Sequence, residues 1–243
     1  MKHFDTVIRG GTVVTAADSA ECDVGIIDGR VAALGLGFSD ADRVIDATGK
    51  LVLPGGIEGH CHIEQKSSVG GVMSADDFFT GTRSAVFGGT TTTLSFAQQI
   101  PGESLRKTVQ DYHECARPKA VIDYGFHLII SDPTEQVLGQ DLPALVADGM
   151  PSFKVYMTYD SLKLDDRQML EVLSTARRCG AMMMIHAENH DMIKWLTDRL
   201  LSGGYVAPKF HAISHADIAE GEATHRAIRL SQLMDVPILL VHV

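Results

Sequence analysis

The chain of 243 residues carries 21 Lys and Arg against 31 Asp and Glu, which gives a formal net charge of −10. A field of this sign repels phosphate backbones and anionic lipids, so the composition argues against nucleic acid and membrane surfaces as partners. Hydrophobic residues make up 45% of the chain, enough for a sizeable core. No apolar run approaches the ~20 residues that span a bilayer.

The N-terminus and the cysteines indicate the compartment. Residues 1–7 (MKHFDTV) contain no apolar stretch and no small-residue cleavage site, so no secretory signal is visible. The cysteines lie far apart and form no C-x-x-C pair: Cys22, Cys61, Cys115 and Cys179. This spacing argues against a disulfide framework and against a structural zinc knot, so we expect a cytoplasmic protein.

Residues 1–50 are expected to form a small β-module. Short apolar runs lie at 4–8, 12–15, 24–27 and 30–34, separated by Gly10-Gly11 and Asp28-Gly29. An Asp-Gly pair between two apolar runs is a strong signal for a two-residue hairpin. No helical period fits this part of the sequence.

Residues 51–243 repeat a pattern of strand, turn and helix. The expected strands lie at 51–57, 91–96, 121–130, 153–157, 181–186 and 236–243. Helix start signals occur between them: Ser74 stands three residues before Asp77 at the head of a helix expected over 76–87, and Asp165-Asp166 precede another. This alternation is typical of βαβ units and of a parallel sheet covered on both faces.

Two α/β architectures fit this alternation, an open doubly wound sheet and a (β/α)₈ barrel. The open sheet usually carries a G-x-G-x-x-G loop after its first strand, and residues 55–59 (GGIEG) lack that spacing. A barrel gathers polar chemistry at the C-terminal ends of its strands, where the histidines fall, so we expect a TIM-type barrel. Six strands are two short of closure, and the last one ends the sequence. The sequence therefore predicts an incomplete barrel over 51–243, as the N-terminal part of a longer protein.

Four histidines fall at the ends of expected barrel strands. His60 and His62 are two residues apart, so their side chains project to the same face. His186 and His242 each close another apolar strand. A single histidine in such a place is more often a hydrogen-bonded core residue, but four from three strands suit zinc or another divalent ion.

Lys154 lies within residues 153–157 (FKVYM), an expected strand that is buried on both faces. Burial lowers the pKa of a lysine, and a neutral amine can capture carbon dioxide as a carbamate that bridges two cations. The alternative is a lysine that extends to the barrel rim. Beside four histidines we favour the ligand.

Five segments match the motifs of one enzyme family, in the family's order. Residues 54–62 (PGGIEGHCH) are similar to its G-x-x-D-x-H-x-H motif, and further matches are 88–92 (GGTTT), 153–157, 186–189 (HAEN) and 241–243 (VHV). The chain thus resembles the cyclic amidohydrolases, and most of all their dihydropyrimidinase/hydantoinase branch. This resemblance implies a small β-sandwich, built partly from residues 1–50, attached to a barrel that holds two zinc ions.

The resemblance also implies roles for single residues. His60 and His62 would bind the more buried ion, His186 and His242 the second, and carboxylated Lys154 would bridge them. Tyr159 matches the tyrosine that stabilises the oxyanion while water, activated by the metals, opens the ring C–N bond. The proton-shuttling aspartate of the family lies beyond position 243.

The sequence departs from the family pattern at several places. Glu58 replaces the usual Asp, Cys61 lies on the opposite strand face as a core residue, and residues 63–67 (IEQKS) lack the Met-Pro-Phe run of dihydropyrimidinases. Residues 213–216 (ISHA) replace the Ser-Arg-Pro often found in this branch. The other histidines are interpreted as surface or packing residues: His3, His113, His127, His190, His211, His215 and His225.

We expect an enzyme, a binuclear-zinc hydrolase of dihydropyrimidines or hydantoins. Its partner would be a small cyclic amide, and relatives imply a homo-oligomer, a dimer or a tetramer. Two alternatives stay open: another cyclic amidohydrolase of the allantoinase or dihydroorotase type, and a non-catalytic scaffold or inactive fragment of the same fold. Every ligand position that the chain reaches is filled, which favours the enzyme.

Overall fold

A computed structural model describes residues 3–66 and 71–243, and Ser67 of the departing segment 63–67 lies outside these ranges. The chain divides into two compact units, Met1–Gly56 and Ile57–Val243, and each is described by itself. No helix in the described ranges is long and apolar enough to cross a membrane. All four cysteines are free.

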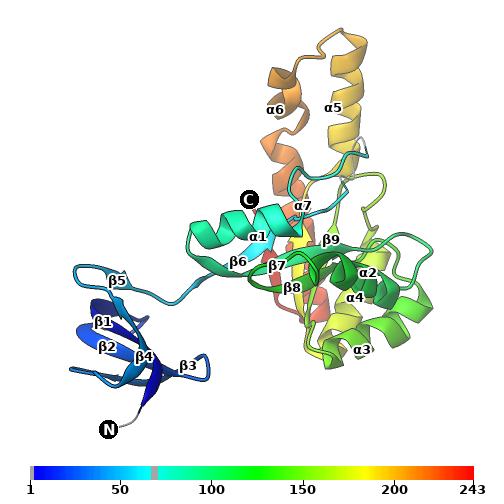
Figure 1. The fold of residues 1–243 in the computed structure, drawn as a ribbon. Helices are drawn as coiled ribbons and strands as arrows, with labels where there is room; N and C mark the ends of the chain where they lie inside the picture. The colour runs from blue at the N-terminus through cyan, green and yellow to red at the C-terminus, as the bar shows by residue number, and fades with distance from the viewer. Residues whose placement is uncertain (1–2, 67–70) are drawn as a thin grey trace. The chain divides into compact units, whose positions relative to one another are not determined.

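The N-terminal unit is one mixed sheet of five strands (Figure 1). Its strands are β1 (Phe4–Val14), β2 (Ser19–Ile27), β3 (Arg30–Gly35), β4 (Ala41–Asp46) and β5 (Leu51–Val52). β2 and β3 form the predicted hairpin, and Asp28 and Gly29 between them have φ of +50° and +69°. Positive φ at both central residues is the backbone that an Asp-Gly turn requires.

Three features of this sheet differ from the expectation. Gly10-Gly11 does not separate two strands, because β1 continues through it with a register shift between Ile8 and Gly11. β4 was not predicted, and it pairs with β1 in parallel. Leu51 and Val52 were expected in the first barrel strand, but they pair with Thr12 and Val13 of β1.

The second unit is a parallel half-barrel of six strands in the order β11-β10-β9-β8-β7-β6. Its strands are β6 (Gly56–Cys61), β7 (Thr90–Gln98), β8 (Asp123–Ile129), β9 (Ser152–Tyr156), β10 (Met182–His186) and β11 (Ile238–Leu240). The predicted incomplete barrel is therefore confirmed. Two strands were misplaced in detail, since the first begins at Gly56 and not at residue 51, and the last covers only three residues of 236–243.

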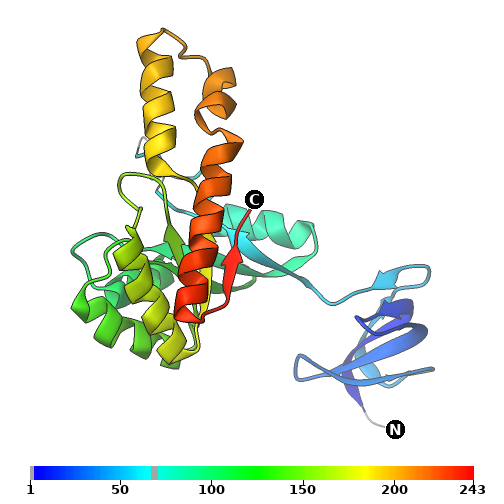
Figure 2. The same cartoon turned by 180° about the vertical axis from the view of Figure 1, so that it is seen from behind.

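Helices occupy the connections between the strands (Figure 2). They are α1 (Phe78–Phe87), α2 (Leu105–Ala116), α3 (Leu142–Ala147), α4 (Asp166–Cys179), α5 (His190–Ser202), α6 (His211–Ser214) and α7 (Asp217–Met234), with a π-turn at Val137–Asp141 and a 3₁₀ turn at Pro208–Phe210. α4 begins at the predicted signal, where Asp165 caps it and Gln168 completes a capping box. α1 is capped by Asp77 with Thr80, and not by Ser74.

Alternation along the strands creates two apolar clusters, one on each face of the sheet. In β9, Phe153 and Val155 pack among the helices, whereas Lys154 and Tyr156 project to the opposite face. That second face carries a small cluster: Phe96, Ile129, Tyr156, Leu162, Met184 and Val241. This smaller cluster forms the apolar floor beneath the predicted site.

Candidate functional site

A cavity of about 400 Å³ lies at the carboxyl ends of the half-barrel strands. Its lining consists of His62, Gln65, Lys66, Val72, Met73, Ser74, Gln98, Lys154, Tyr156, Tyr159, Leu162, His186 and His242. Parallel strands all end at the same edge, so residues far apart in sequence meet there. Five of the six predicted site residues line this cavity, and the sixth, His60, contacts Lys154 beside it.

His60 belongs to β6, and His62 follows the end of that strand. Their ring centroids lie 5.7 Å apart, and both rings pack on Phe96. Cys61 points the other way, packs against the helix-side core and places Sγ 3.4 Å from Ser95 Oγ. Burial, followed by the charge of Lys154, lowers the pKa of His60 to about 4, so this imidazole is neutral at pH 7.

Lys154 is the most deeply buried cationic side chain of this site, with 1% of its surface exposed. Its Nζ lies 3.1 Å from His60 Nε2 and 4.3 Å from the centroid of the Phe96 ring. Desolvation lowers the pKa of the amine to about 8. At pH 7 about a tenth of this amine is therefore neutral, a far larger share than for an exposed lysine with a pKa of about 10.4.

His186 closes β10, and His242 follows β11. Their ring centroids lie 4.7 Å apart, and those of His242 and His60 lie 5.3 Å apart. His186 Nε2 donates to Glu188 Oε2 at 2.6 Å. That hydrogen bond lowers the pKa of the Glu188 carboxyl, so a charged carboxylate orients the ring.

Tyr159 stands in the turn after β9, with its ring 5.3 Å from that of His186. Burial raises the pKa of its hydroxyl, which therefore stays protonated and able to donate. Two of the five non-glycine residues with positive φ in the described ranges line this cavity: Tyr159 and His242. Left-handed backbone at such residues is costly and concentrates at functional sites.

The two histidine pairs have a spacing that bears on metal binding. Two imidazoles that bind one zinc ion at about 2.1 Å place their ring centroids roughly 5 Å apart, close to the spacing of both histidine pairs. In residues 3–66 and 71–243, no group of three or more His, Cys, Asp or Glu side chains is arranged to hold a metal ion. Lys154 lies beside both pairs at this cavity, so it is the side chain available to supply a further ligand.

The chain is similar to known proteins over nearly its whole length. No protein-family model matches the chain. The chain is 45% identical to a D-hydantoinase of Streptomyces coelicolor and 44% identical to one of Geobacillus stearothermophilus, each over 98% of its length. It superposes on a solved D-hydantoinase with a TM-score of 0.95 at 41% identity, covering 99% of this chain and 52% of that one. For a dihydropyrimidinase from Brevibacillus agri the TM-score is 0.93 at 44% identity, covering 98% and 52%.

The chain is a homologue of the D-hydantoinases and dihydropyrimidinases. The resemblance inferred from the five motifs is therefore confirmed. The chain spans about half the length of the curated hydantoinases it matches, 52% for the Streptomyces and 50% for the Geobacillus protein.

Sequence reasoning missed three polar residues that support the site of this hydantoinase homologue. Glu188 was quoted within a motif but given no role. Gln65 was noted only as a departure, although its side chain contacts His62. His127, interpreted as a surface or packing residue, is buried, with hydrogen bonds to Ser152 Oγ and the Gly59 carbonyl. Glu188 and Gln65 lie two and three residues after their histidines, so their spacing is a local signal that could have found them. The partners of His127 are far away in the sequence, and no local pattern indicates them.

The metal-free chain is expected to lose stability as the pH falls below about 6.5. Burial lowers the pKa of His60 to about 4 and also lowers that of His127. A neutral buried imidazole favours folding above the unfolded pKa of 6.5, and this contribution is lost as the pH falls towards the folded pKa. Urea midpoints at pH 7.5 and pH 5 measure the loss.

His127→Gln should flatten this pH dependence, whereas His225→Gln on α7 should leave it unchanged. Equal urea midpoints of the unsubstituted chain at the two pH values would contradict the expectation.

Proposed function

We propose that the protein is a metal-dependent hydrolase that opens the ring C–N bond of hydantoins or dihydropyrimidines. The observation that carries this proposal is the meeting of four histidines, Lys154 and Tyr159 at one cavity. These side chains come from four separate strand ends, and none of their spacings in sequence requires them to meet.

His60 and His62 would hold one divalent ion, and His186 and His242 a second. Zinc suits this set because imidazole nitrogens are among its preferred ligands. When bound, such ions polarise a carbonyl group and lower the pKa of water towards about 7.

Lys154 would carry a carbamate. Its neutral amine attacks carbon dioxide, the new N–C bond forms, and the amine proton leaves to solvent. The lowered pKa and the burial of the side chain support this step, because both favour the neutral amine. The product would be a carbamate anion beside His60, in the cavity that His62, His186 and His242 line.

Tyr159 would act on the substrate. Its hydroxyl donates a hydrogen bond to the carbonyl oxygen of the ring as negative charge develops there. Water adds to the carbonyl carbon, the ring C–N bond breaks, and the leaving nitrogen takes up a proton. The apolar floor around Phe96 and Leu162 excludes bulk water from this side of the cavity.

The substrate, the oligomeric state and the compartment belong to the same proposal. A small cyclic amide is the substrate partner, and the hydantoinase resemblance implies a dimer or a tetramer. Four free cysteines support a reducing, cytoplasmic compartment.

Metal content and hydrolysis of the intact protein test this function. We expect about two zinc ions per chain by elemental analysis, and ring opening of hydantoin or dihydrouracil that is lost on chelation and restored by zinc. A folded intact protein that binds no divalent metal would contradict the proposal.

A further inference from the structure

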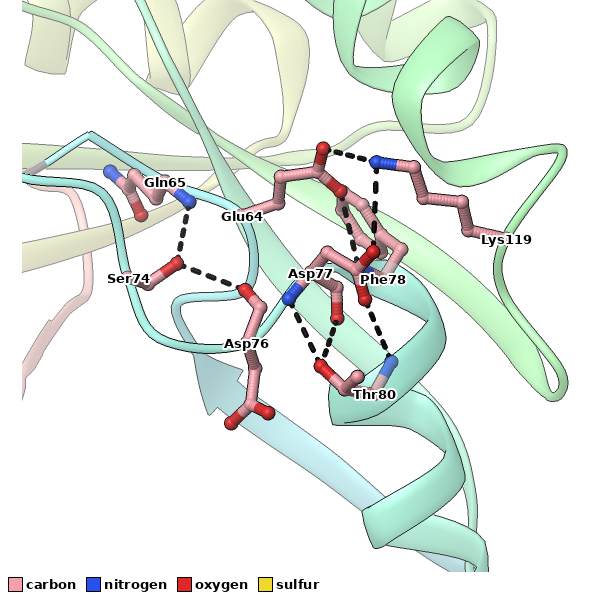
Figure 3. Close-up of polar contacts among 8 residues, drawn as sticks. All are labelled: Glu64, Gln65, Ser74, Asp76, Asp77, Phe78, Thr80 and Lys119. Carbon is pink, nitrogen blue, oxygen red and sulfur yellow. Dashed lines mark hydrogen bonds and ion pairs between the residues drawn. The ribbon is translucent and has the colours of Figure 1, made fainter.

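The segment that follows His62 is anchored by its neighbours. Ser74 Oγ accepts from the Gln65 amide at 2.9 Å, and the Ser74 amide donates back to the Gln65 carbonyl. Glu64 pairs with Lys119 and also accepts from the Phe78 amide at 3.1 Å (Figure 3). These contacts fix the backbone at Gln65 without using its side chain.

The Gln65 side chain is therefore not needed to hold this backbone, and it makes other contacts. Only 8% of the residue is exposed. Its Nε2 donates to Gln98 Oε1 at 2.7 Å, which turns its Oε1 to His62 Nδ1 at 2.5 Å. A carbonyl oxygen only accepts, so the Nδ1 atom of His62 carries the hydrogen.

Phe96 fixes the plane of the same imidazole. The two rings are stacked, with centroids 4.7 Å apart and an interplanar angle of 20°. Stacking alone would allow either ring nitrogen to face the cavity. Gln65 removes this ambiguity, because only Nδ1 finds an acceptor behind the ring. In the described ranges no hydrogen bond occupies His62 Nε2.

We propose that Gln65 is a positioning residue that holds His62 as the Nδ1–H tautomer, with the Nε2 lone pair presented to a divalent cation. This inference rests on the proposed metal-dependent function and adds a residue to it. Partners of this kind fix the tautomer and orientation of a ligating histidine, and their loss typically costs 10–100-fold in metal affinity.

Two substitutions separate positioning from mere packing. Gln65→Met keeps the length of the side chain but removes the strong acceptor, since a thioether accepts only weakly. Gln65→Glu keeps an acceptor for His62, gives up the donation to Gln98 and adds a negative charge. Gln110→Met, on the exposed side of α2, is the matched control.

The first readout needs no metal. Histidine is labelled with ¹⁵N, the His62 signals are assigned by their loss in His62→Gln, and the ring nitrogens are recorded at pH 8. We expect the Nδ1–H form in the unsubstituted protein, in Gln65→Glu and in Gln110→Met, and a shift towards Nε2–H in Gln65→Met. The second readout is zinc affinity by chelator competition, which should fall 10–100-fold in Gln65→Met only.

The two proposals fail in different ways. An unsubstituted protein that shows Nε2–H, or a Gln65→Met variant with unchanged tautomer and zinc affinity, would overturn the role of Gln65 and leave the proposed function standing. A protein that keeps the Nδ1–H form but binds no zinc would overturn the proposed function, while the assignment of Gln65 to the tautomer would hold.

Discussion

Lys154→Ala is expected to abolish binuclear metal binding and to reduce ring hydrolysis by roughly 10³-fold or more. Without the lysine, each histidine pair lacks the ligand that completes its coordination, and the chain offers no substitute group of three donors in its described part. Charge stabilisation by metal ions is worth several kcal/mol, and about 4 kcal/mol corresponds to 10³-fold in rate.

The zinc content of the variant and the NMR signal of the carbamate measure this effect. Protein equilibrated with ¹³C-bicarbonate should show one carbamate resonance by NMR, absent from Lys154→Ala. Lys163→Ala is the matched control, because this exposed lysine lies just beyond the same strand and does not line the cavity. Lys154→Gln is a second variant that fills more of the buried space than alanine does, so it is less prone to unfold. Unchanged metal content in both folded Lys154 variants would refute the bridging role.

Tyr159→Phe is expected to lower kcat by roughly 10²–10³-fold, the usual loss when one donor to a developing oxyanion is removed. The phenol carries its hydroxyl at the cavity wall, and burial keeps it protonated. Because the hydrogen bond strengthens only as charge develops, KM should change little. The ring remains, so its packing beside Tyr156 and His186 is preserved.

Steady-state kinetics with hydantoin or dihydrouracil test this expectation, together with zinc content and thermal midpoint, both of which should match the unsubstituted protein. Tyr205→Phe, a half-exposed tyrosine outside the cavity, is the control. A Tyr159→Phe variant with undiminished kcat would assign the tyrosine to the rim as an ordinary aromatic residue.

Local patterns in the sequence were sufficient for the architecture of residues 57–243. The β9 segment is buried at every position, Lys154 included, as expected for a strand covered on both faces. Asp165 caps α4 because its carboxylate reaches an amide only three residues away. Such signals depend on residues close together in the sequence, so they can be predicted without knowledge of the fold.

The same reasoning misplaced residues 51–57, because strand pairing is a long-range event. Leu51 and Val52 are as apolar as a barrel strand, and their pairing with β1, some forty residues earlier, is not written in their own composition. β4 escaped prediction for the same reason, since only its parallel partner β1 makes it a strand.

The candidate site divides in the same way. The sequence by itself placed His60 and His186 at strand ends and Lys154 within a buried strand, and parallel strands bring their ends together along one edge. Only the tertiary structure decided the long-range contacts around them: Gln98 with Gln65, and the Gly59 carbonyl with His127. A hydrogen bond needs two atoms within about 3 Å, and that distance is set by the packing of loops against strands, which no spacing along the chain encodes.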